Sequence, residues 1–142
     1  MRHRDRGPKT GSMAILIRSL ALGAGIAAYF IVAPRLSSTP PGDPDIGLGL
    51  LAFGLLVVAA SGWGFVDGTR RVLREVATTW AGTALVVSVG WLLVLSVGQA
   101  DESMSATELM RADAGLLPFT FGIVLVPALA AGAIGSTARR TR

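Results

Sequence analysis

The chain has 142 residues, of which 51% are hydrophobic and only 15% are charged. A soluble domain of this size needs a more polar exterior, so the composition predicts a protein whose outer surface faces lipid. The sequence pI is near 11.0, yet the basic residues lie at the ends of apolar blocks, which excludes a nucleic-acid binder. Cysteine is absent and the only histidine is His3, which excludes disulfides and most metal sites.

Four apolar blocks follow one another along the chain, at about 13–33, 46–66, 76–98 and 114–136. Each has roughly the 20 residues that cross a hydrocarbon core at 1.5 Å per residue. None alternates with period 2, so helices are expected rather than strands. We therefore predict an all-α polytopic membrane protein with a single domain, a four-transmembrane-helix bundle. Cleavage of the first block as a signal peptide is the less favoured alternative, because the block is long and Pro34 follows it.

The basic residues indicate the orientation of this bundle. Ten of the 13 lie in the tail 1–12, the second loop and the tail 137–142: Arg2, Arg4, Arg6, Lys9, Arg70, Arg71, Arg74, Arg139, Arg140 and Arg142. The opposite loops hold only Arg35 and Arg111. The positive-inside rule then places both termini in the cytoplasm of a cell membrane protein. Such a strong bias also predicts that any homo-oligomer is parallel.

The loops are too short to hold an extramembrane domain. The first outer loop, 37–44, is a turn rich in serine and proline. The second outer loop, 99–113, contains Ser105-Ala-Thr-Glu108, which fits a capping box. A short helix through Met110, lying on the membrane surface, is therefore expected there.

Small residues recur at spacings of four within the blocks, as in Ala60–Gly64 and Ala128–Gly132. This spacing lets helices approach closely in lipid. We assign helix-packing roles to Gly62, Gly64, Gly68, Pro127 and Gly132. Pro127 is expected to kink the fourth span, and Gly68 to take the left-handed position at the end of the second. Packing within the chain and packing between subunits both stay open.

The aromatic residues suggest a membrane depth for each span. Trp63 and Trp80 are expected near the cytoplasmic interface and Tyr29 near the outer one. Trp91 lies deeper, where packing is a more common role than ligand binding.

Arg18 is the only charge well inside a span, and intramembrane charge is the usual pointer to function. Its side chain either snorkels to the cytoplasmic headgroups or pairs with Asp67. Asp67 itself is either an ordinary helix terminus or a carboxylate at the mouth of a polar cavity. We select Asp67, Arg18, Thr79, Thr83 and Glu108 as candidate transport or polar-network residues. Substitution of Asp67 by Asn is expected to leave membrane insertion intact.

No catalytic motif accompanies these residues. The sequence lacks HExxH, the GxSxG elbow, a Walker loop and any Ser/His pair, so we predict neither an enzyme nor a bound cofactor or metal.

Two segments carry a family resemblance. The end of the second block, Trp63-Gly-Phe-Val-Asp67-Gly-Thr-Arg70, fits a W-G-x-x-D-G-x-R pattern, and Glu108-Leu precedes an apolar run that ends at Pro127. These segments resemble the bacterial four-helix drug/metabolite transporter-like family of small actinobacterial membrane proteins. The resemblance implies transport of an unspecified substrate. The first span, however, carries Arg18 where small multidrug exporters have a glutamate, which puts proton-driven drug export in doubt.

Two functions follow as hypotheses. The first is a transporter subunit that acts as an oligomer, because four helices alone enclose little space. The alternative is a non-enzymatic structural or regulatory membrane protein that binds a partner helix or anionic lipid. A transporter is expected to have a polar cavity lined by Thr79, Thr83 and Asp67, whereas an interaction protein is expected to have a dry core and a groove of small residues.

Overall fold

The computed structural model describes residues 9–36, 46–98 and 105–140. The described chain is entirely helical: α1 (Lys9–Leu36), α2 (Ile46–Arg70), α3 (Leu73–Gly98), α4 (Ala106–Ala112), the 3-10 turn η1 (Asp113–Gly115) and α5 (Leu116–Arg140). α1, α2, α3 and the α4–α5 segment are each long and apolar enough to cross a membrane. The all-α prediction and the four long helices are therefore confirmed.

The predicted short helix is present as α4. Its N-cap is Ser105, whose side chain accepts from the backbone N–H of Glu108, while the Glu108 carboxylate accepts from the backbone N–H of Ser105. These reciprocal bonds satisfy two N–H groups that a helix terminus leaves without partners. The N-terminal tail 1–8, the first outer loop and residues 99–104, which carry much of the predicted orientation signal, lie outside the described residues.

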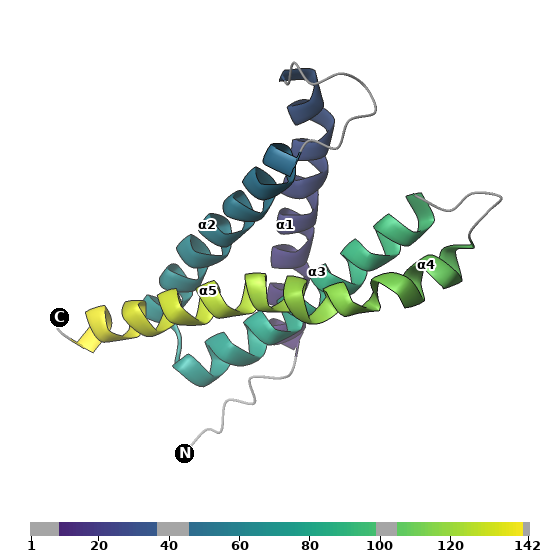
Figure 1. Cartoon of the computed structure of the whole chain (residues 1–142). Coiled ribbons are helices and arrows are strands. Elements are labelled where there is room, and N and C mark those ends of the chain that lie inside the picture. Colours follow the sequence, from purple (N-terminus) through teal and green to yellow (C-terminus); the bar gives the residue numbers. More distant parts are fainter. Residues whose placement is uncertain (1–8, 37–45, 99–104, 141–142) are drawn as a thin grey trace.

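α2 and α5 run in the same direction, contact each other, and converge toward their C-terminal ends (Figure 1). Their contact extends from the edge-to-face pair Phe53 and Phe119 to a close approach of the two backbones near their C-terminal ends. A Cβ atom at Gly64 would overlap the Ala128 backbone, and one at Gly68 would overlap the Gly132 backbone. Glycine is required at these positions because the helix axes approach too closely for any side chain.

The structure corrects one sequence-based assignment for a glycine and restricts another to contacts between subunits. Gly68 lies inside α2 rather than at a left-handed cap, because the helix continues to Arg70. Its role is the close approach to Gly132. Gly62 is exposed, and a Cβ there would meet no atom within 4 Å. Gly62 therefore takes no part in packing among the described helices. Pro127 lies inside α5, which continues across it to Arg140, so the predicted kink stays a prediction.

The core lies where the middle parts of α1, α2 and α5 meet the N-terminal half of α3. Its fully buried members include Trp80, Val76 and Val124. α1 packs on α3 at Gly82, where the Ile15 side chain fills the space of a Cβ. Beyond this core the hairpin of α1 and α2 diverges from α3 and α4, as Figure 1 shows. The helices are thus tightly packed at the end of the molecule that holds the C-termini of α2 and α5, and they separate toward the opposite, open end (Figure 1).

Candidate functional site

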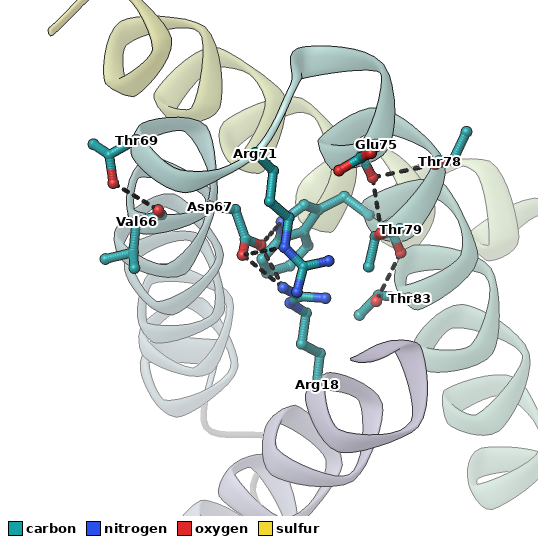
Figure 2. A network of polar contacts seen from close by, with 10 residues as sticks. Arg18, Val66, Asp67, Thr69, Arg71, Glu75, Thr78, Thr79 and Thr83 are labelled. Atoms are coloured by element: carbon teal, nitrogen blue, oxygen red, sulfur yellow. Dashed lines mark hydrogen bonds and ion pairs between the residues drawn. The ribbon is translucent and has the colours of Figure 1, made fainter. Parts of the chain in front are cut away.

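A buried charged cluster joins three helices at the tightly packed end. Arg18 of α1 donates through Nη2 to both carboxylate oxygens of Asp67 on α2, at 2.6 and 2.7 Å. Trp80 of α3 donates its indole N–H to Asp67 Oδ2 at 2.9 Å. The exposed fractions of Arg18, Asp67 and Trp80 are 4%, 6% and 0%. Of the two predicted positions of Arg18, the structure therefore shows the pair with Asp67 (Figure 2).

Two indole rings surround the Arg18 guanidinium. Its Cζ atom lies 5.8 Å from the ring centroid of Trp63 and 5.6 Å from that of Trp80. A guanidinium is weakly hydrated and is attracted to aromatic faces, so these rings offset part of the cost of burial. Among the described residues, Arg18 Nε and Nη1 have no hydrogen-bond partner. The cluster is therefore an electrostatic unit in which the carboxylate and the rings together stabilise one buried cation.

Further arginines lie around this cluster. Arg71 Nε is 3.8 Å from Asp67 Oδ1, and the Arg71 side chain is 38% exposed. Arg139 of α5 donates to the Arg71 carbonyl at 3.2 Å. Two guanidinium groups thus share the Asp67 carboxylate, which leaves an excess of positive charge at this end of the molecule. The contact through Arg139 also links α5 to the end of α2.

Thr79 and Thr83, which were expected to line a polar cavity, are buried, and their hydroxyls form hydrogen bonds within α3. Thr79 Oγ1 donates to the Glu75 carbonyl at 2.8 Å, and Thr83 Oγ1 donates to the Thr79 carbonyl at 2.9 Å. Such bonds to the carbonyl four residues earlier satisfy a hydroxyl within its own helix. Thr79 and Thr83 lie near the charged cluster in Figure 2, yet neither bonds to Arg18 or Asp67. Glu108 lies apart from the cluster, exposed on α4 and bonded to Ser105.

Three apolar cavities between the described helices lie apart from the charged cluster. One of about 140 Å³ lies between all four long helices. A groove of about 910 Å³ runs between α1 and α3, and a third cavity of about 300 Å³ lies between α1 and α2. None of the three is lined by Asp67, Thr79 or Thr83. The polar cavity expected for transport therefore does not coincide with any of these spaces.

Within the described residues, no group of three or more His, Cys, Asp or Glu side chains lies close enough to hold a metal ion. The cluster itself offers one carboxylate, already bonded by an arginine and an indole. Its chemistry is charge neutralisation and cohesion between α1, α2 and α3.

The fold and this site define a class: an all-helical chain with four helices apolar enough to span a bilayer, compatible with a multi-pass membrane protein. Comparison with protein-family models, with curated proteins and with solved structures finds no match. The resemblance to the four-helix drug/metabolite transporter-like family thus stays a prediction.

Sequence reasoning proposed the pairing of Arg18 and Asp67 but missed the third partner. The sequence indicated only an interfacial depth for Trp80, and the structure shows that the side chain is also fully buried and bonded to Asp67. The spacing of 13 residues between Asp67 and Trp80 crosses the turn between α2 and α3, so no helical periodicity indicates the contact. The sequence also did not predict the aromatic lining of the central cavity, the one of about 140 Å³ between all four long helices. Its rings, Phe30, Phe53 and Trp91, come from three different helices.

Replacing Trp80 with Phe tests the cohesive role of the cluster. Phe keeps an aromatic face for Arg18 but removes the N–H that Asp67 accepts. A hydrogen bond to a charged group contributes about 1.5–3 kcal/mol, and we expect a loss of unfolding free energy of that size. Unfolding in mixed detergent micelles, followed by far-ultraviolet circular dichroism, measures it. Trp63→Phe, which removes no such bond to Asp67, is the matched control, and an equal loss in both variants would contradict the proposed role.

Proposed function

We propose that this chain is a non-enzymatic multi-pass protein of the cell membrane, with both termini in the cytoplasm, and that it acts by binding a partner transmembrane helix between α1 and α3. The observation that carries the proposal is the apolar α1–α3 groove of about 910 Å³. The first partner to consider is a second copy of this chain in parallel orientation.

Charge supports the proposed orientation. Arg70 ends α2, Arg71 follows it, and Arg74 lies in the first turn of α3, while Arg139 reaches Arg71 from the end of α5. These arginines gather at one end of the described helices, which is the end assigned to the cytoplasm by the positive-inside rule. They also favour contact with anionic lipid headgroups there.

The dimensions of the groove fit a helix. Its α1 wall extends from Leu16 to Phe30, which corresponds to about 21 Å at 1.5 Å per residue. That length is several helical turns and exceeds what a small solute needs. The walls are apolar except for Ser19, and a charged or strongly polar occupant would find no partners there.

Two kinds of glycine distinguish the groove from the core. Gly64 and Gly68 are small because α5 occupies the space that a side chain would fill. Gly23 and Gly90 line the groove, and a Cβ at either would meet no atom within 4 Å. Small residues let helices approach closely in lipid. No part of the described chain occupies the space beside Gly23 and Gly90, so a partner helix can approach the backbone there.

Transport is the second candidate function, and one observation favours it. A buried ion pair inside a membrane span commonly marks a substrate or proton path, and Arg18 and Asp67 form such a pair. The three cavities, however, are apolar, and a small apolar solute enters lipid without a protein. The geometry therefore supports partner binding better than transport.

A panel of single-cysteine variants tests both functions, since the native chain has no cysteine. Ala27→Cys and Gly90→Cys place a thiol in the groove, and Gly54→Cys places one on an exposed part of α2 outside all three cavities. Each variant is labelled with benzophenone maleimide in native membranes and irradiated. We expect discrete protein adducts at positions 27 and 90 and none at position 54.

The outcomes separate the hypotheses. An adduct of twice the chain mass identifies a second copy as the partner. Adducts with lipid alone at all three positions would overturn the proposal, because the groove would then be ordinary lipid-facing surface. Reaction of Thr83→Cys with a water-soluble thiol reagent would instead favour transport, since it requires an aqueous path through the core.

A further inference from the structure

The central cavity differs from the groove in its lining. Three aromatic rings surround it: Phe30 of α1, Phe53 of α2 and Trp91 of α3. Phe30 and Trp91 stack with ring centroids 5.5 Å apart and an interplanar angle of 27°. No charged residue lines the cavity, and Thr120 of α5 contributes the only hydroxyl. The space is therefore suited to a flat, uncharged molecule.

The volume limits the size of that molecule. The cavity measures about 140 Å³, and an engineered apolar cavity of about 150 Å³ in another protein stays dry and binds benzene. Aromatic rings pack favourably against one another at centroid distances of about 4.5–7 Å. A single aromatic ring accordingly fits both the volume and the walls.

The Thr120 hydroxyl donates to the Leu116 carbonyl at 2.9 Å, and the surface of the cavity is almost entirely apolar. The walls therefore offer a ligand aromatic and aliphatic contacts rather than hydrogen bonds.

We propose that the cavity between the four long helices is a binding site for a small uncharged aromatic molecule. Such a molecule dissolves in the bilayer and reaches the cavity through the α1–α3 groove, which shares Ile26, Phe30, Val87 and Trp91 with the cavity lining. Occupancy of the cavity requires no second protein, although a partner helix seated in the groove would contact the same four residues and close this entrance.

The test uses 4-fluorophenol as the probe and the full chain in lipid nanodiscs. Titration followed by ¹⁹F NMR is expected to show a saturable shift at one equivalent, above the partition into empty nanodiscs.

Two glycine variants supply a matched pair. A Cβ at Gly49 or at Gly54 meets no atom within 4 Å, and both residues lie in α2, so Leu at either position is compatible with the fold. Only Gly49 lines the cavity. Gly49→Leu is expected to abolish the saturable shift, whereas Gly54→Leu keeps it. Equal binding by the two variants, or no saturable shift in the native chain, would overturn the proposal.

Discussion

Replacing Asp67 with Asn is expected to destabilise the folded bundle more than any other single polar substitution in the described chain. The change leaves the Arg18 guanidinium buried between Trp63 and Trp80 without its counter-ion. Removing one partner of a buried ion pair costs about 3–5 kcal/mol, because the other charge stays buried and uncompensated. The asparagine side chain keeps a carbonyl oxygen that can accept from the Trp80 N–H. The decrease in unfolding free energy therefore reports on the lost charge of Asp67 rather than on the indole bond.

The measurement is a double-mutant cycle with Arg18→Met. The single Arg18→Met variant leaves Asp67 with the Trp80 N–H and the half-exposed Arg71, so its loss is expected to be smaller, about 1–3 kcal/mol. The double variant has no buried charge and retains the indole bond. Its unfolding free energy is expected to lie near that of the native chain, because replacing both partners of a buried pair is often neutral.

Additive losses in the double variant would contradict this account, since they would mean that Arg18 and Asp67 stabilise the fold separately. The comparison also separates membrane insertion from the packing of the inserted helices. Membrane insertion of Asp67→Asn is still expected to be intact, because an uncharged side chain at the end of α2 lowers the cost of insertion. Packing of the inserted helices is the step that is expected to fail.

The four long helices were predictable because their signal is local. Twenty consecutive apolar residues leave few alternatives to a helix, and the observed α1 and α2 extend the predicted spans by only a few residues at their ends. The capping box at Ser105 was predictable for the same reason, since both of its residues lie within one turn. Each of these features depends on neighbours in the sequence.

The surroundings of the site were less predictable because they depend on how helices meet. Spacing alone assigned Gly62 and Gly64 the same role, yet only Gly64 faces α5. Thr79 and Thr83 were read as lining a cavity, whereas their hydroxyls are bonded within α3. Which side of a uniformly apolar helix faces its neighbour is decided by three-dimensional packing, and a sequence without an amphipathic pattern carries little information about it.

The close contact of α2 and α5 leads to a prediction of comparable size. A Cβ at Gly68 would lie 2.8 Å from the Gly132 Cα and carbonyl carbon, and these backbone atoms cannot move without separating the helices. Overpacking of a core commonly costs about 1–3 kcal/mol. We expect Gly68→Ala to lower the unfolding free energy by about 3 kcal/mol or more, although alanine has the higher intrinsic helix propensity.

Gly62→Ala is the matched control for this substitution. It makes the same chemical change in the same helix, six residues away, where a Cβ meets no atom. Its effect is expected to be neutral or stabilising by about 0.5–1 kcal/mol, the helix-propensity advantage of alanine over glycine. The difference between the two variants in unfolding free energy then reports mainly the backbone contact at Gly68, because the helix-propensity gain is common to both. Equal effects would mean that α2 and α5 do not approach at Gly68, and the convergence of the helices around the Arg18–Asp67 pair would lose its structural basis.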